Sequence, residues 1–187
     1  MKDIFVKTAH QRILNFFLAR PTGWFYGSEI AKKTGVSSGR VSNVLKDLSV
    51  SLLLEKDVRG KTELYRVLMD SPALRAFKVL NTVVSIAPLV ESLSRFSTRI
   101  ILYGSSARGV NIEGSDLDLL VVSVSRDNVL SSVLNFPRRS YYGFSEIKPV
   151  VKKTEEWAFL ESNDPVFYNE VQKGILLYER KIDEQAL

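Results

Sequence analysis

Two aspartates and a glycine–serine pair lie close together in the stretch ILYGSSARGVNIEGSDLDLLVVS, in the second half of the chain. Asp116 and Asp118 are two residues apart in an apolar segment typical of a β-strand, so both carboxylates should share one face. Neighbouring carboxylates repel each other, and a divalent cation that accepts hard oxygen ligands relieves the repulsion. The spacing therefore predicts a magnesium site at the start of this strand.

Gly104 and Ser105 follow the strand-like run RIILY and open a short helical segment. Backbone N–H groups at such a turn can hold phosphate, while Ser105 adds a hydroxyl donor and Arg108 a charged one. Transfer of a nucleotidyl group requires a triphosphate to be held and its charge to be neutralised. We therefore expect Gly104, Ser105 and Arg108 to bind a nucleotide, and Asp116 and Asp118 to hold the metal.

These segments together carry a family resemblance. GS at 104–105, ARG at 107–109 and SDLDL at 115–119 resemble the signature of the polymerase-beta nucleotidyltransferase superfamily, especially its minimal prokaryotic members. The resemblance is dense over residues 99–124 and looser in the remainder of this half. It implies a small mixed sheet with helices, an NTP substrate and two magnesium ions on the aspartates. It also implies a third carboxylate on a neighbouring strand.

Glu146 is the only acid on the expected strand from Phe144 to Val151, and it is the candidate for that third catalytic and metal-binding carboxylate. Its alternation with Ile147 permits the role. Many relatives have aspartate here, and Glu146 could equally be an ordinary strand-end charge near Lys148. The pairs Arg138-Arg139 and Tyr141-Tyr142, just before this strand, could meet a nucleobase or an acceptor, or form a surface loop.

The first 70 residues have a different organisation, which resembles a winged helix-turn-helix domain. A helical segment at 4–20 is followed by a short helix beginning near Ser28 and ending at Gly35. A second helix begins at Ser37 or Ser38, and a hairpin follows with its turn at Arg59-Gly60. The second helix would enter the major groove of DNA, although some winged helices bind only protein.

DNA contacts are expected from the second helix and from the hairpin. Arginine and asparagine suit guanine and adenine edges, and wing lysines and arginines suit phosphates. Residues 1–70 hold 12 Lys and Arg against 7 Asp and Glu, within a net charge of +5 for the chain, and a basic unit is typical of a polyanion partner. The predicted DNA-binding residues are Ser38, Arg40, Ser42, Asn43, Lys46, Arg59 and Lys61.

The expected fold class is α+β, with three parts. A winged helix-turn-helix domain spans 1–70, a linking helix spans 71–98 with Pro88 kinking or dividing it, and a nucleotidyltransferase domain spans 99–187. In the last part, a helix is expected at 127–135, one capped by Thr154, one opened by Asp164-Pro165, and a final strand in ILLYER.

Composition excludes several classes of protein. The chain has no cysteine and one histidine, which excludes disulfides and thiolate zinc sites and disfavours a histidine metal site. No apolar run is long enough for a membrane span, and the N-terminus lacks the layout of a signal peptide, so we expect a cytoplasmic protein without a membrane partner.

The sequence thus predicts magnesium-dependent transfer of a nucleoside monophosphate from NTP to an unknown acceptor, in a protein that also binds double-stranded DNA. One alternative is a DNA-binding transcriptional regulator whose transferase-like domain is a sensor or an inactive scaffold. Another is an antitoxin-like protein that modifies or masks a protein partner such as a toxin. A homodimer is an open expectation, because winged-helix proteins often dimerise.

Overall fold

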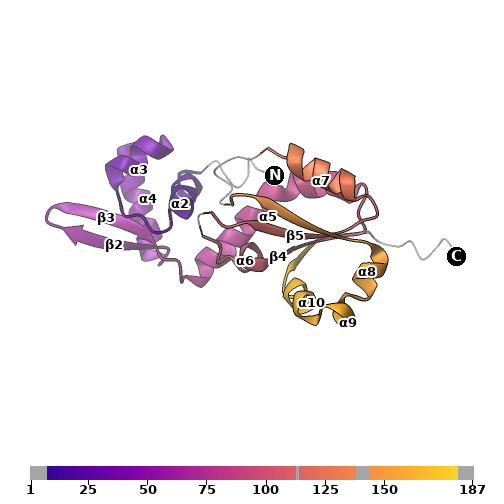
Figure 1. The fold of residues 1–187 in the computed structure, drawn as a ribbon. Coiled ribbons are helices and arrows are strands. Elements are labelled where there is room, and N and C mark those ends of the chain that lie inside the picture. The colour runs from indigo at the N-terminus through magenta and orange to yellow at the C-terminus, as the bar shows by residue number, and fades with distance from the viewer. Residues whose placement is uncertain (1–7, 113, 138–143, 181–187) are drawn as a thin grey trace.

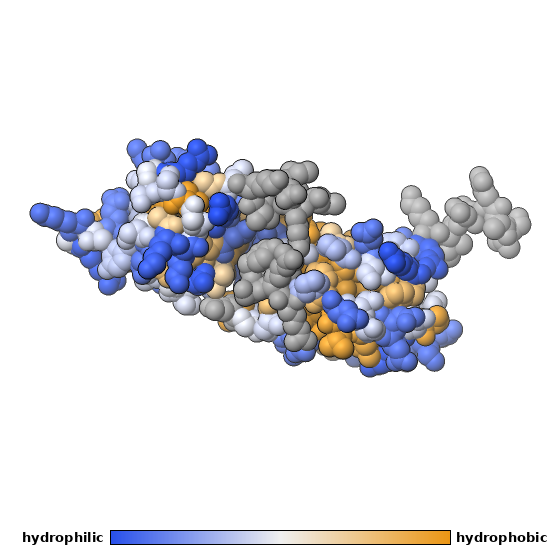
Figure 2. Space-filling model, turned by 90° about the horizontal axis from the view of Figure 1, so that it is seen from above, coloured by the Kyte–Doolittle hydropathy of each residue, from blue (hydrophilic) through white to orange (hydrophobic). Residues whose placement is uncertain are grey.

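A computed structural model describes residues 8–112, 114–137 and 144–180 of the chain (Figure 1). Within these residues, three helices and a hairpin form one end of an elongated molecule, a four-stranded sheet with helices forms the other, and a long helix joins them (Figure 1). The hairpin end has a hydrophilic surface, whereas hydrophobic residues gather on the surface of the other half (Figure 2). The chain is therefore α+β, as the sequence predicts, and the two ends are called its N-terminal and C-terminal units below.

The N-terminal unit has the element order expected of a winged helix-turn-helix domain. Its small sheet has the order β1-β3-β2, with both pairings antiparallel. Strand β1 is only two residues long and was not expected from the sequence, because a strand of that length leaves no alternating pattern. The elements are α2 (Ala9–Leu18), β1 (Phe25–Tyr26), α3 (Gly27–Thr34), α4 (Ser38–Val50), β2 (Leu54–Arg59) and β3 (Thr62–Val67).

The helix ends in this unit show which local signals decide the boundaries. Gly35 has a φ of 66° and ends α3, as expected, by donating its N–H to the Ala31 carbonyl. The start of α3 differs from the expectation, because Ser28 lies inside the helix. Instead, the Glu29 carboxylate accepts the N–H of Tyr26 at 2.9 Å and caps the helix from within its first turn.

Helix α5 (Pro72–Ser94) belongs to both units. Leu74 is buried in the core of the N-terminal unit, whereas Ile86, Leu89 and Leu93 are buried in the core beneath the second sheet. Pro88 lies within the helix and does not divide it. Among the described helices, α5 alone is long and apolar enough, by length and composition, to cross a membrane, whereas no such segment was expected from the sequence. Its most apolar window is 39% buried, and its buried residues contribute to both cores.

The C-terminal unit is a mixed sheet of order β6-β5-β4-β7, in which β5 and β6 are parallel and the other two pairings are antiparallel. Helices α5 and α7 cover one face and α8 to α10 the other (Figure 1). The elements are β4 (Arg99–Tyr103), α6 (Gly104–Arg108), β5 (Leu117–Val122), α7 (Arg126–Asn135), β6 (Ile147–Lys152), α8 (Thr154–Ala158), α9 (Leu160–Asn163), α10 (Pro165–Gln172) and β7 (Ile175–Glu179).

Alternation along β5 decides which face carries the acidic pair. Leu117, Leu119 and Val121 are buried against α5 and α7, whereas Leu120 and Val122 are buried on the side of α10. Asp118 has the parity of Leu120, so its carboxylate lies on the α8–α10 face.

The ends of the helices on this face agree only in part with the sequence predictions. Asp164 caps α10 through the Phe167 N–H at 3.0 Å, but α8 is preceded by Lys153 as its cap residue, and Thr154 is its first residue.

Lys78 of α5 is an unusual buried cation beneath the loop that leads to the aspartates. Its side chain is 6% exposed, and its ammonium donates to the Asn111 carbonyl. Burial first, and then the nearby charge of Arg75, lower its pKa from 10.5 to about 8. At neutral pH the lysine is protonated in both states, and keeping the charge buried in the folded protein lowers the free energy of unfolding. Between pH 8 and pH 10.5 the unfolded chain holds this proton more tightly than the folded protein does, so the destabilisation decreases as the pH rises.

We therefore predict that the free energy of unfolding rises between pH 7.5 and pH 9.5, by about 2 kcal/mol from this group. In Lys78→Met this pH-dependent rise should be absent. Loss of the hydrogen bond to Asn111 would change the free energy of unfolding by the same amount at both pH values. Urea denaturation at pH 7.5 and pH 9.5 measures the change in the free energy of unfolding. Lys61→Met, in the exposed turn between β2 and β3, is the control and should show the same pH dependence as wild type. Equal slopes in wild type and Lys78→Met would refute the assignment.

Candidate active site

Asp116 and Asp118 lie where the sheet meets the turn after β4. Asp118 pairs across the sheet with Tyr103, the last residue of β4, and Asp116 immediately precedes β5. Gly104 follows Tyr103 with a φ of 73° and opens α6. The structure therefore brings the predicted acidic pair and the predicted phosphate-binding turn to the same corner of the sheet.

Gly104 lies against the side chain of Asp118. A Cβ on this residue would lie 2.5 Å from Oδ2 of Asp118, so no larger residue fits without moving the carboxylate. Ser105 is the second residue of α6 and is partly exposed, whereas Ser106 is buried and its hydroxyl is 3.5 Å from the Asp116 carbonyl. Glycine is thus required at position 104 for two reasons: the backbone has a left-handed conformation, and the Asp118 carboxylate leaves no room for a Cβ.

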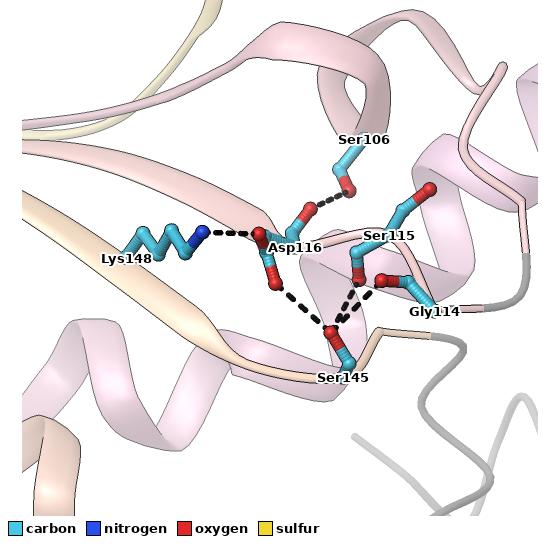
Figure 3. Close-up of polar contacts among 6 residues, drawn as sticks. All are labelled: Ser106, Gly114, Ser115, Asp116, Ser145 and Lys148. Carbon is cyan, nitrogen blue, oxygen red and sulfur yellow. Dashed lines mark hydrogen bonds and ion pairs between the residues drawn. The ribbon is translucent and has the colours of Figure 1, made fainter.

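Both carboxylate oxygens of Asp116 already have partners within the protein (Figure 3). Lys148 Nζ lies 2.6 Å from Oδ2, and the Ser145 hydroxyl lies 2.9 Å from Oδ1. The hydrogen bond from Lys148 lowers the pKa of Asp116, and the bond from Ser145 lowers it further. Asp116 is therefore a stably ionised group whose charge is balanced by an internal ammonium.

Asp118 is in the opposite situation. Burial raises its pKa, and the charges of Asp116 and Glu170 raise it further. Its carboxylate makes no hydrogen bond or ion pair with any residue that the structure describes. A partly buried, unpartnered carboxylate next to a second one gains most from an added cation, so the pair fits one divalent ion.

Arg108, predicted to clamp the triphosphate, is paired with Glu170 of α10. Glu170 lies close enough to the site for its charge to raise the pKa of Asp118 and, after the effect of burial, that of Tyr103, which reaches about 12. Arg108 is thus near the acidic pair but engaged elsewhere. A bound triphosphate would have to replace Glu170 as its partner.

Glu146 lies outside the strand on which it was expected. The strand begins at Ile147, not at Phe144, and Glu146 is an exposed residue whose main-chain carbonyl accepts the Leu117 N–H at 2.8 Å. The register of the parallel pair places Lys148 beside Asp118. Over residues 8–112, 114–137 and 144–180, no three acidic or histidine side chains gather as a metal site, so the described carboxylates do not form the set expected for two ions.

The residues Arg138, Arg139, Tyr141 and Tyr142, with Glu113, lie outside the described residues. Sequence reasoning missed the contacts of Ser145, Lys148 and Glu170. Lys148 lies on β6, Ser145 lies in the segment just before it, and Glu170 lies on α10. A lysine, a serine and a helical glutamate carry no motif of their own, and only the strand register and helix docking bring them to the aspartates.

The predicted DNA-binding residues lie together on the surface of the N-terminal unit. The five from the second helix are in the first three turns of α4, and the other two lie at the tip of the β2–β3 hairpin. Arg59 pairs with Asp57 at 2.8 Å. All seven side chains are exposed: Ser38, Arg40, Ser42, Asn43, Lys46, Arg59 and Lys61.

Two solved structures are similar to parts of the chain. One is a candidate nucleotidyltransferase from Sulfolobus solfataricus, with 18% identity and a TM-score of 0.40 over 60% of this chain and 93% of that one. The other is TrmBL2, an archaeal chromatin protein described as showing a novel mode of DNA binding, with 16% identity and a TM-score of 0.32 over 92% of this chain and 76% of that one.

No curated protein matches the chain significantly. The family model of the nucleotidyltransferase domain matches residues 85–183, more than half of the 187 residues. The match begins within α5 and includes the whole sheet with Gly104, Asp116 and Asp118. The chain therefore belongs to the nucleotidyltransferase domain family.

Proposed function

We propose that this protein transfers a nucleoside monophosphate from an NTP to an acceptor hydroxyl in a magnesium-dependent reaction. The observation that carries the proposal is the pair Asp116 and Asp118 at the start of β5, with Asp118 in contact with the Gly104 turn. In the reaction, the acceptor oxygen bonds to the α-phosphorus, the bond from that phosphorus to the pyrophosphate oxygen breaks, and the hydroxyl proton passes to a base.

Each residue has a distinct part in this proposal. Gly104 and Ser105 offer main-chain and hydroxyl donors to the phosphates, and Arg108 adds a positive charge once Glu170 releases it. Asp116 and Asp118 would hold magnesium, which neutralises charge on the triphosphate as the pyrophosphate leaves. Asp118 is partly buried, and the lower polarity of its surroundings would strengthen its attraction to the ion.

The test uses the full chain with each of the four α-labelled NTPs and magnesium, with and without cell extract. We expect label to pass to a macromolecule or to a small acceptor, and the Asp118→Asn protein to give none. Absence of labelling from all four nucleotides, in a protein that also fails to bind them, would exclude the activity.

A second function has its own structural support. Asp116 is held by Lys148 and Arg108 by Glu170, so the two charges that substrate would use are satisfied without it. This arrangement suits a nucleotide sensor or an inactive scaffold attached to a DNA-binding unit. Tight NTP binding with no labelled product, in the same assay, would favour that alternative over the enzyme.

The N-terminal unit is proposed to bind double-stranded DNA through α4 and the wing. The exposed side of α4 carries Arg40, Asn43 and Lys46, while Val41, Val44 and Leu45 of the same helix are buried. Among the described residues, Arg40 and Lys46 have no ion-pair partner, so both charges are free to meet phosphates or base edges.

We predict that Arg40→Ala weakens binding to a specific site by about 1–3 kcal/mol, because one side chain reading a guanine is worth that much. Lys61→Ala at the wing tip should instead weaken all sequences alike and reduce the salt dependence by about one counterion. Fluorescence anisotropy with selected and scrambled duplexes over a salt series separates the two. If the full chain binds no duplex at low salt, the winged helix is a protein-binding module.

A further inference from the structure

Lys148 stands where a metal ligand would be expected. In the parallel pairing of β5 and β6, Lys148 is the register partner of Asp118, and paired residues of parallel strands point to the same face. Its ammonium reaches back to Asp116 Oδ2 at 2.6 Å (Figure 3). The neighbouring strand therefore presents a cation to the acidic pair.

The charges around Lys148 explain why it stays there. The hydrogen bond and charge of Asp116 raise the pKa of Lys148, and the charges of Glu146 and Asp118 add to the effect. One ammonium thus faces three carboxylates, of which it contacts one directly. Its side chain is 57% exposed, so it can leave Asp116 without unfolding the sheet.

The two aspartates are unequal as a result. Asp116 has both oxygens engaged, by Lys148 and Ser145, while Asp118 has no partner among the described residues. A divalent ion entering the pair can bind Asp118 at once, but it can share Asp116 only against the repulsion of the ammonium. That repulsion is significant at such short range even when solvent screens it.

We propose that Lys148 is a built-in counter-cation that limits this site to a single divalent ion. The inference rests on the proposed nucleotide site and adds a property to it. Lys148 supplies the second positive charge that the acidic pair requires, and it competes with the metal for Asp116. It is a positioning residue, since it acts on metal occupancy through Asp116.

The first test measures Mn²⁺ alone, by electron paramagnetic resonance of the free ion. Removing the ammonium removes its repulsion, so Lys148→Met should bind Mn²⁺ about tenfold more tightly than wild type. Lys152→Met is the matched control, since Lys152 lies on the same strand with the same parity and has no ion pair among the described residues. It should behave as wild type, and equal affinities in all three proteins would overturn the proposal.

The second test counts bound Mn²⁺ in the presence of non-hydrolysable NTP analogues. Wild type should hold one ion per chain, and Lys148→Glu, which puts a carboxylate beside Asp118, should hold two, while Lys152→Glu keeps one. Two ions in wild type, or one in Lys148→Glu, would contradict the inference. A wild-type protein that binds none of the analogues would refute the nucleotide site instead, and the measurement with Mn²⁺ alone would still decide the role of Lys148.

Discussion

Asp118→Asn is expected to lower the rate of nucleotidyl transfer by at least about a thousandfold while leaving the protein folded. Asp118 has no partner among the described residues, so in the proposed reaction an ion held by it would stabilise the charge that develops as pyrophosphate leaves, and an amide could not hold that ion in the same way. Its pKa is raised by burial first and then by Asp116, which means that the ionised carboxylate is unfavourable in the folded protein. Asparagine removes that charge, so the melting temperature of the variant should match or exceed that of wild type.

Steady-state labelling and thermal unfolding of the same preparations check this expectation. Asp127→Asn is a suitable control, because Asp127 is an exposed acid in the first turn of α7, away from the pair. Binding of magnesium and NTP should also be lost in Asp118→Asn and kept in Asp127→Asn, by calorimetric titration. Equal binding of magnesium and NTP by wild type and Asp118→Asn would refute the assignment of the acidic pair to the binding site.

Gly109→Ala is expected to cost about 3 kcal/mol of stability. Gly109 ends α6 with a φ of 68°, a conformation that costs a residue with a Cβ about 1 kcal/mol. The added Cβ would also overlap the main chain of Arg75 in α5, which cannot move as a side chain does. The change therefore forces apart helix α5 and the turn at the end of α6, next to the proposed nucleotide site.

Gly60→Ala separates these two costs. Gly60 has a φ of 64° at the hairpin tip, and a Cβ there would meet no atom within 4 Å. Urea denaturation should show a loss of about 1 kcal/mol in Gly60→Ala and the larger loss in Gly109→Ala. Similar losses in both proteins would mean that the contact between α5 and α6 adapts freely.

The parts of the site that follow one another in the chain could be predicted from the sequence. The alternation around Asp116 and Asp118 and the glycine after an apolar strand are local signals, and the structure places them at one corner of the sheet. The start of α10 and the end of α3 were also predictable, since Asp164-Pro165 and Gly35 act on their own backbone.

The parts that depend on pairing between distant segments could not be predicted. Whether Glu146 or Lys148 reaches the aspartates depends on where β6 begins and on its register with β5, and shifting the start from Phe144 to Ile147 changes the answer. The pairing of Arg108 with Glu170 depends on how α10 docks on the sheet, 62 residues further along the chain. Neither the register of β6 with β5 nor the packing of α10 on the sheet is marked by a periodic pattern in the sequence.

Helix α5 contributes buried residues to the cores of both units, and this sharing should couple their stability. Leu74 at its start fills one core and Leu93 near its end fills the other, so neither core is complete without the same continuous helix. Unfolding of either core would expose part of α5 and weaken the packing of the same helix against the other core. The protein should therefore melt in a single cooperative transition, and the occupancy of a ligand at either end should raise the stability of both.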